Sequence, residues 1–377
     1  MAIKEGGRLE RGTLPACLLL FFYPEVLGVH KPRTLRQPSL ELTTNLPDME
    51  WRAVQEVIVK NMKIILQGRV EGELLQRLES IVGDEHTFVT PGSQEELIEE
   101  GKDTEVFYGY CSEDLFPHLP NIKWIQSSSA GMDRHMYPAI RESDVVLTNA
   151  AGLYATHVAD QAFALLLGLA RGIHESVRNQ DKHQWGGART MPMIEIDGFK
   201  IGIVGMGGIG MQMAKRAKGF DMYVMAVDAY RTDKPDTVDE LMPMDQLSNM
   251  MSQVDVVMIA CPLTEETRGL INKDNLSVMQ PTAFFINVAR GPIVNEPDLI
   301  EILRAGTFAA AGLDVTEIEP LPADSPLWDF DNVIISPHSA GGSQRRMYRI
   351  TSFFLDNLER YLKGEELKNV VNKQLGF

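Results

Sequence analysis

The stretch KIGIVGMGGIG, residues 200–210, guides the interpretation of the whole sequence. Its apolar half predicts a buried strand, and a helical pattern follows its three glycines, which have the spacing G-x-G-x-x-G. Those glycines are Gly205, Gly207 and Gly210. In a dinucleotide site they permit a tight turn, close approach of the backbone to a pyrophosphate, and close packing of helix on strand. The N–H groups at the start of the helix favour phosphate, and Asp228, at the end of the next predicted strand, can bind a ribose. The stretch therefore predicts a dinucleotide-binding site that holds NAD.

The composition limits the class of protein. The chain has 377 residues, more than a typical single domain, and its 44% hydrophobic content is ample for two buried cores. The net charge of −16 argues against nucleic acid and against anionic membrane surfaces as partners. The cysteines are widely spaced and odd in number; they are Cys17, Cys111 and Cys261. They fit a reduced, cytoplasmic compartment and predict neither a disulfide framework nor a metal site.

Residues 1–61 are an N-terminal extension that we expect to be poorly ordered. The run LPACLLLFF, residues 14–22, faintly resembles the apolar core of a signal peptide. Acidic residues interrupt the basic segment before it, no small-residue cleavage site follows, and the run is too short to span a bilayer. The extension is therefore the favoured interpretation and secretion the alternative. Met62 opens the first convincing strand.

From Met62 onward the pattern alternates strands and helices, which is typical of a parallel α/β sheet. The predicted strands of the first part cover residues 62–68, 105–110, 122–129 and 145–152. A long helix over 154–177 is apolar on nearly every face, so we expect it to be buried between domains or against another subunit. The second part begins at Lys200, and its further strands cover residues 222–227, 254–260, 282–288, 308–315 and 332–336. An amphipathic helix after Gly342 is expected to pack back onto the first domain. The fold class is therefore α/β with two doubly wound parallel-sheet domains.

Four polar residues lie near the ends of predicted strands of the second part, Asp314 within the strand 308–315 and the others after their strands. They are Arg290, Asp314, Glu319 and His338. Because the carboxyl ends of parallel strands share one edge of a sheet, we expect all four side chains to meet beside the glycine loop. Each residue alone also fits an ordinary structural role, as a surface cation, a turn residue or a loop histidine. Their common position at one edge favours a functional site.

The types of these residues suit the reduction of a ketone by a nicotinamide. His338 can give a proton to the developing alkoxide near neutral pH. A carboxylate such as Glu319 can fix the tautomer of the ring and favour imidazolium. The guanidinium of Arg290 is a planar fork that can hold a substrate carboxylate and polarise the neighbouring carbonyl.

Residues 62–377 resemble the D-isomer-specific 2-hydroxyacid dehydrogenases along their whole length. The blocks that carry the resemblance are GMGGIG (205–210), ACPLTEETRGLIN (260–272), INVARG (286–291), GLDVTEIEPLP (312–322) and SPHSAGG (336–342). The resemblance implies that Arg290, Glu319 and His338 form the catalytic set of the family. It also implies that the backbone of Ala130 and Gly131, in SSSAGMD, binds the substrate carboxylate together with Arg290 and His338.

The resemblance further implies which residues border the cofactor. They are Gly205, Gly207, Gly208, Ile209, Gly210, Asp228, Cys261, Pro262, Leu263, Thr264, Thr267, Val288, Ala289, Asp314 and Gly341. It implies a flavodoxin-like substrate domain made of residues 62–153 and 344–377, and a Rossmann NAD domain made of residues 154–343. The long apolar helix matches the arm through which the family forms homodimers.

Some choices stay open at this stage. The charge of Asp228 repels a 2′-phosphate and favours NAD over NADP, but Arg231 and Lys234 lie just beyond and weaken that preference. Glyoxylate or hydroxypyruvate is the favoured substrate, reduced to the D-2-hydroxy acid. The alternatives are a dehydrogenase for formate, phosphite or 3-phosphoglycerate, and a non-catalytic NAD-responsive binding protein on the same fold. Candidates for lining the substrate pocket are His135, Tyr137, Trp328, Arg345 and Arg346.

Overall fold

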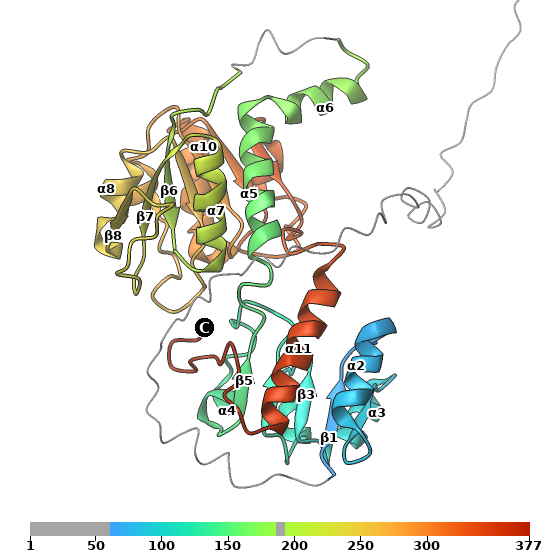
Figure 1. The fold of residues 1–377 in the computed structure, drawn as a ribbon. Helices are drawn as coiled ribbons and strands as arrows, with labels where there is room; N and C mark the ends of the chain where they lie inside the picture. Colours follow the sequence, from blue (N-terminus) through green and yellow to red (C-terminus); the bar gives the residue numbers. More distant parts are fainter. Residues whose placement is uncertain (1–60, 186–192) are drawn as a thin grey trace, which may run out of the picture. The chain divides into compact units, whose positions relative to one another are not determined.

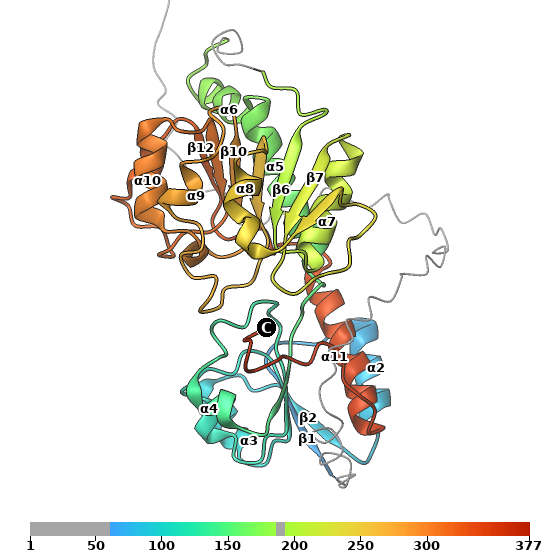
Figure 2. The same cartoon turned by 90° about the vertical axis from the view of Figure 1, so that its left-hand side faces the viewer.

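The computed structural model describes residues 61–185 and 193–377, and their arrangement is drawn in Figures 1 and 2. The predictions made for the N-terminal extension and for Cys17 lie outside the described residues. The described strands form two sheets, of five and seven strands, and every pairing between named strands is parallel. In the same residues, no helix has both the length and the apolar character needed to cross a membrane.

The first sheet has the spatial order β2-β1-β3-β4-β5, in which the direction of winding reverses between β1 and β3. Its strands are β1 (Lys63–Leu66), β2 (Thr87–Val89), β3 (Val106–Tyr108), β4 (Trp124–Gln126) and β5 (Val146–Thr148). Its helices are α2 (Gly72–Val82), α3 (Gln94–Gly101), the 3₁₀ turn η1 (Phe116–His118), α4 (Pro138–Glu142) and α11 (Arg346–Leu362). Apolar residues of α3 and α4 cover one face of this sheet, and those of α2 and α11 cover the other. This strand order is the flavodoxin-like one.

The second sheet has the order β12-β11-β10-β9-β6-β7-β8, in which the direction of winding reverses between β6 and β9. Its strands are β6 (Lys200–Val204), β7 (Tyr223–Val227), β8 (Glu240–Met242), β9 (Val256–Ile259), β10 (Phe284–Asn287), β11 (Ala310–Leu313) and β12 (Val333–Ile335). Its helices and 3₁₀ turns are α5 (Ala155–Ala170), α6 (Ile173–Asp181), α7 (Gly208–Gly219), η2 (Met244–Gln246), α8 (Leu247–Met251), α9 (Lys273–Leu276), η3 (Gly291–Ile293), α10 (Glu296–Ala305) and η4 (Pro326–Asp329). Helices α5 and α7 lie side by side on one face, and α8 to α10 cover the other (Figures 1 and 2). The two doubly wound α/β domains predicted from the sequence are thus confirmed.

Strands β2 and β8 and helix α3 are among the elements that the sequence analysis did not name. Strands β2 and β8 are three residues long and lie at sheet edges, where their side chains are half-buried or exposed. Such strands lack the continuous apolar run that marks a strand buried on both faces, as in β9. Helix α3 has a strongly acidic sequence, and its serine N-cap is the one local signal that marks its start.

The long helix predicted over 154–177 is wrong in its extent. Helix α5 ends at Ala170, Gly172 takes the left-handed conformation with φ of 60°, and α6 starts at Ile173 in a new direction (Figure 1). Within the chain, α5 packs on α7 and on strands β10 to β12 of its own sheet. The apolar character of α5 therefore reflects the core of its own domain.

Helix α11 returns to the five-stranded sheet, as expected. The ring of Phe354 stacks on Tyr108 with centroids 4.4 Å apart. Arg77 of α2 pairs with Asp356 at 2.7 Å and with Glu359 at 2.8 Å. The residue limits of the two domains, 62–153 with 344–377 and 154–343, remain a prediction.

The turn between β6 and α7 generates a test of stability. A Cβ atom placed on Gly210 would lie 2.1 Å from the carbonyl oxygen of Gly205, so Gly210→Ala must displace the turn. We expect a loss of about 1–3 kcal/mol in the free energy of unfolding, measured by urea denaturation followed by circular dichroism. Gly219→Ala, at the other end of the same helix, meets no atom within 4 Å and should stay within about 1 kcal/mol of the unsubstituted protein. Equal stability of the two variants would contradict the close packing at Gly210.

Candidate active site

The glycine loop between β6 and α7 has the geometry that a dinucleotide requires. Gly205 has φ of 97°, and a Cβ atom there would lie 2.6 Å from the backbone nitrogen of Cys261. A Cβ atom on Gly207 would meet no atom within 4 Å, so the backbone at this position is open to an approaching group. Helix α7 starts at Gly208, and its first N–H groups have no partner within the helix. The loop therefore fits a pyrophosphate at the helix N-terminus.

Asp228 lies at the end of β7, beside the glycine loop. One carboxylate oxygen accepts the N–H of Met206 at 2.6 Å, and the other accepts the N–H groups of Tyr230 and Arg231 at 2.9 and 2.8 Å. The Nε of Arg231 donates to the carbonyl oxygen of Met206 at 3.1 Å, and its side chain is only 10% exposed. A fixed carboxylate and a fixed guanidinium therefore stand together where a ribose would bind.

The other residues predicted to border the cofactor follow the carboxyl ends of β9 to β12. They are Cys261, Pro262, Leu263, Thr264 and Thr267 after β9, Val288 and Ala289 after β10, Asp314 after β11, and Gly341 after β12. Burial raises the pKa of the Cys261 thiol to about 12, so this side chain acts in packing and stays a thiol. In the part of the chain that the structure describes, no cluster of three or more His, Cys, Asp and Glu residues could hold a metal ion.

Asp314 organises the loop after β12. Its carboxylate is buried and accepts the hydroxyl of Ser336 at 2.5 Å and the N–H groups of Ser339 and Ala340 at 3.0 and 2.9 Å. Its backbone carbonyl accepts the N–H of His338 at 2.7 Å. Asp314, which the resemblance places near the nicotinamide, thus also determines the shape of the loop that carries His338.

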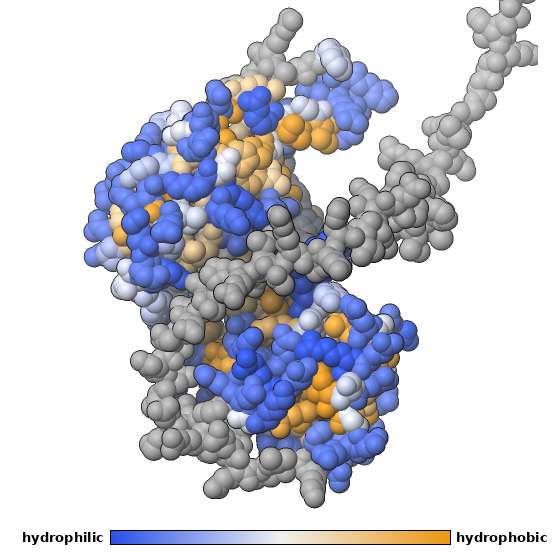
Figure 3. Space-filling model, viewed as in Figure 1, coloured by the Kyte–Doolittle hydropathy of each residue, from blue (hydrophilic) through white to orange (hydrophobic). Residues whose placement is uncertain are grey.

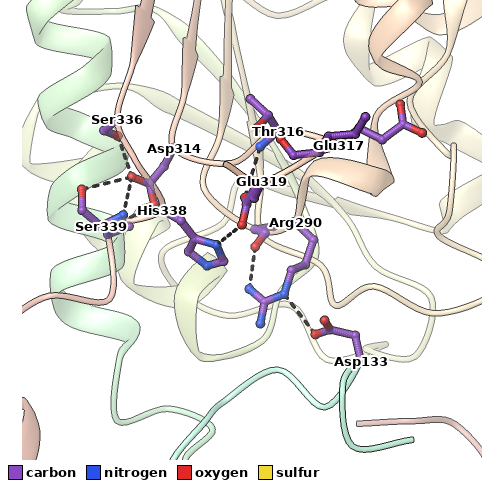
Figure 4. A network of polar contacts seen from close by, with 12 residues as sticks. Asp133, Arg290, Asp314, Thr316, Glu317, Glu319, Ser336, His338 and Ser339 are labelled. Atoms are coloured by element: carbon purple, nitrogen blue, oxygen red, sulfur yellow. Dashed lines mark hydrogen bonds and ion pairs between the residues drawn. The ribbon is translucent and has the colours of Figure 1, made fainter. Parts of the chain in front are cut away.

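His338 and Glu319 form a direct pair (Figure 4). The Nδ1 atom of His338 lies 2.7 Å from a carboxylate oxygen of Glu319, and the second oxygen accepts the N–H of Thr316 at 3.3 Å. His338 takes the left-handed conformation, with φ of 50°. Because the carboxylate occupies Nδ1, the Nε2 atom is left to exchange a proton with another molecule.

Arg290 follows β10 and lies near this pair (Figure 4). Its Nε donates to Asp133 at 3.0 Å, and its Nη1 donates to the carbonyl oxygen of Ala289 at 2.8 Å. The third nitrogen, Nη2, lies against Gly131, where a Cβ atom would come within 1.9 Å of it. The sequence analysis predicted that the planar fork of Arg290 holds a substrate carboxylate; in the structure Nε and Nη1 already have protein acceptors, and Nη2 is the nitrogen without one among the described residues.

In the loop 127–133, which follows β4, three consecutive backbone carbonyl groups accept hydrogen bonds from other parts of the chain. The carbonyl oxygen of Ser128 accepts the hydroxyl of Tyr154 at 2.5 Å, and that of Ser129 accepts the N–H of Ala150 at 2.9 Å. The side-chain amide of Asn149 donates to the carbonyl oxygen of Ala130 at 3.3 Å. Within the described residues, the N–H groups of Ala130 and Gly131 meet no acceptor. Two free backbone donors and the Nη2 atom of Arg290 therefore lie together, which suits a carboxylate.

The sequence analysis did not assign Asp133 or Tyr154 to the site. Asp133 stands in a quoted motif and Tyr154 at the start of a predicted helix, but the partner of each lies far away in the sequence. Of the candidates for lining a pocket, His135 and Tyr137 are buried, while Trp328 and Arg345 are exposed and Arg346 donates to Tyr154. In the part of the chain that the structure describes, none of these five residues forms a hydrogen bond or ion pair with Arg290, Glu319 or His338.

Comparisons with known proteins identify the family. Residues 163–340 match the family described as D-isomer specific 2-hydroxyacid dehydrogenase, NAD binding domain. A glyoxylate reductase from Thermofilum pendens is 34% identical over 292 residues, with 76% of this chain and 86% of that protein covered. A hydroxypyruvate reductase from Blautia hydrogenotrophica is 31% identical over 330 residues, with 84% and 100% covered. A D-isomer specific 2-hydroxyacid dehydrogenase from Xanthobacter autotrophicus, solved with NADPH, is 27% identical, with a TM-score of 0.68 and 85% and 100% covered. The chain therefore belongs to the D-isomer-specific 2-hydroxyacid dehydrogenases, which are oxidoreductases.

Proposed function

We propose that this protein reduces a small 2-oxo acid, such as glyoxylate or hydroxypyruvate, to the D-2-hydroxy acid with NADH, in a reversible reaction. The observation that carries the proposal is the His338–Glu319 pair at 2.7 Å, near Arg290 and the two free N–H groups of Ala130 and Gly131. A proton donor and a carboxylate-binding set therefore occur together, as the reduction of a 2-oxo acid requires.

Each residue has a definite role in this proposal. The Nε2 atom of His338 donates the proton to the alkoxide oxygen and takes it back in the reverse direction. Glu319 accepts a hydrogen bond from Nδ1, which fixes the tautomer and the orientation of the ring. The Nη2 atom of Arg290 and the N–H groups of Ala130 and Gly131 hold the carboxylate, which places the carbonyl group for reaction. A bound nicotinamide would supply the hydride.

The residues that would hold the cofactor are those at the strand ends of the second sheet. The N–H groups at the start of α7 would take the pyrophosphate, because Gly207 leaves the backbone accessible there. Asp228 would take the ribose. A non-catalytic binding protein needs no paired histidine and glutamate, so the His338–Glu319 contact favours an enzyme over that alternative.

Two names among the relatives support a small substrate, since one is a glyoxylate reductase and another a hydroxypyruvate reductase. For the cofactor, the carboxylate of Asp228 favours NAD by repelling a 2′-phosphate. The guanidinium of Arg231 would attract a 2′-phosphate and so favours NADP, and the Xanthobacter relative was solved with NADPH. NADH is the proposed cofactor because Arg231 is already paired with Asp233 at 2.7 Å, which reduces its attraction for phosphate.

A homodimer and a cytoplasmic location complete the proposal. Ile173 and Val177, one turn apart on α6, are 54% and 52% exposed, and Figure 3 shows apolar surface over α5 and the start of α6. Beside them, Phe220 and Ile194 help to line a hollow of about 340 Å³. A second copy of the chain would bury this surface.

The cytoplasmic location follows from the reduced cysteines predicted in the sequence.

The proposed proton transfer predicts the effect of His338→Asn. Turnover of NADH with glyoxylate, hydroxypyruvate, pyruvate or phosphohydroxypyruvate, followed at 340 nm, should fall about 10²–10⁴-fold, since the variant lacks a titratable group. The affinity for NADH, measured by fluorescence titration, should not change. His118→Asn, at an exposed position of the first domain, is the matched control and should keep full activity. Unchanged turnover in His338→Asn would exclude this residue as the proton donor.

The proposed cofactor choice predicts the effect of Asp228→Asn. Loss of the negative charge removes repulsion of a 2′-phosphate while Arg231 stays in place, so the ratio of kcat/KM for NADPH to that for NADH should rise about tenfold. Asp236→Asn removes the same charge from an exposed position further along and should leave the ratio unchanged. A native preference for NADPH would contradict the proposed cofactor.

The proposed homodimer predicts a mass of twice 42.1 kDa in light scattering after gel filtration. Val177→Glu should shift the mass to that of a single chain, because a buried unpaired carboxylate destabilises an apolar interface. Val278→Glu, at an exposed valine two residues after α9, should leave the dimer intact. A native chain that is monomeric at micromolar concentration would refute the assembly.

A further inference from the structure

We propose that Tyr154 is a positioning residue that holds the loop 127–133 in the form that binds the carboxylate of the substrate. The inference rests on the proposed function, in which Ala130 and Gly131 of this loop bind that carboxylate. It adds a residue that none of the family blocks in this sequence contains and to which the resemblance assigned no role.

The first observation is where the hydroxyl of Tyr154 lies. Tyr154 stands directly before α5, a helix that packs on the seven-stranded sheet, and its side chain is buried. Its hydroxyl donates to the carbonyl oxygen of Ser128 at 2.5 Å. Ser128 belongs to the loop after β4 of the five-stranded sheet. A side chain attached to one domain thus fixes a peptide group of the other.

The second observation is a charged donor behind this hydroxyl. The Nε atom of Arg346 donates to the hydroxyl oxygen of Tyr154 at 3.3 Å, and its guanidinium lies 5.5 Å from the centre of the ring. A hydroxyl that accepts a hydrogen bond from a cation becomes a stronger donor itself. Arg346 begins α11, where the chain returns to the first sheet. Tyr154 therefore contacts the loop and also the segment by which the chain returns.

The third observation is that the same peptide group is held on its other side. The N–H of Ser129 donates to the hydroxyl oxygen of Ser127 at 3.0 Å, and that oxygen lies 3.1 Å from Nε2 of His135. Burial lowers the pKa of His135 to about 4, so the ring is neutral at pH 7 and adds no charge that would compete with Arg290. The peptide between Ser128 and Ser129 is thus fixed at its oxygen and at its nitrogen.

The fixed peptide group determines the orientation of the next two residues, Ala130 and Gly131. Once the Ser128 peptide is fixed, the chain enters Ala130 and Gly131 in one orientation, with their N–H groups free beside Nη2 of Arg290. A loop that is ordered before the substrate arrives loses less entropy on binding. Without the hydroxyl of Tyr154, the Ser128 carbonyl loses its donor and the loop gains other orientations. The affinity for the carboxylate should fall, whereas the affinity for the cofactor should not, because the residues predicted to border the cofactor lie outside this loop.

The experiment compares Tyr154→Phe with Tyr108→Phe. Tyr108 is also buried, and its hydroxyl pairs with Thr351 at 3.1 Å, so each substitution removes one bonded hydroxyl from the same kind of side chain. In Tyr154→Phe we expect KM for the 2-oxo acid to rise about 3–10-fold, the effect of one lost hydrogen bond. We expect kcat and the NADH dissociation constant to stay within about twofold of the native values. Tyr108→Phe should leave KM unchanged even where it lowers the melting temperature.

A second variant separates the hydroxyl from its charged donor. Arg346→Met keeps most of the aliphatic chain but removes the hydrogen bond to Tyr154, so KM should rise in the same direction by a smaller factor. An unchanged KM in Tyr154→Phe overturns the inference. So does a loss of NADH affinity as large as the rise in KM, because the hydroxyl would then act on the fold in general.

A binding measurement distinguishes this inference from the proposed function. If the native protein turns over no 2-oxo acid, the proposed function fails, and the loop is tested with oxalate by calorimetry without cofactor. Weaker oxalate binding by Tyr154→Phe than by Tyr108→Phe supports the positioning role. Equal binding by the two variants overturns it.

Discussion

The buried carboxylate of Asp314 is the interaction on which the arrangement of the site depends. A residue with a carboxylate that is only 1% exposed destabilises the fold unless donors surround the charge, and here the donors are two hydroxyls and two backbone N–H groups from residues 336–340. The loop after β12 supplies those donors in the conformation that the structure shows. That conformation places His338 in the left-handed region, with Nδ1 directed at Glu319. The geometry of the proposed proton donor is thus a consequence of satisfying a buried charge one strand away.

A close backbone contact brings the second part of the site to the same place. A Cβ atom on Gly291 would lie 1.8 Å from the carbonyl oxygen of Thr316, so only glycine permits the turn after β10 to touch the loop after β11. Arg290 precedes that glycine, and Glu319 follows in the touched loop. The same holds at Gly131, which leaves room for the guanidinium of Arg290. The absence of a side chain at Gly131 and at Gly291 therefore determines how closely Arg290 approaches its neighbours.

The sequence was sufficient to predict those features that depend on local pattern and on the geometry of parallel sheets. Arg290, Asp314, Glu319 and His338 could be grouped because parallel strands end at one edge, which needs no knowledge of side-chain contacts. The end of α5 at Ala170 could not be read from hydropathy, because the apolar pattern continues through Ile173 and Val177 on the far side of Gly172. Asp133 and Tyr154 were missed for another reason. Asp133, after β4, contacts Arg290, which follows β10 of the other sheet, and Tyr154, directly before α5, contacts Ser128 after β4. Nothing in the spacing of a single sequence specifies such a pair.

The charges around Arg290 also explain why the overall composition says little about the substrate. The chain carries a net charge of −16, yet the proposed substrate is an anion. The site does not overcome this with a cluster of cations, since Arg290 is paired with Asp133 and His338 with Glu319. The attraction for a carboxylate must therefore come from short-range donors, namely the N–H groups of Ala130 and Gly131 and one nitrogen of Arg290. Backbone dipoles of this kind act over a few ångströms and depend strongly on orientation. Because the recognition is local, the shape of the loop matters more than the net charge, and the side chains that fix that shape belong to the binding site as much as the donors do.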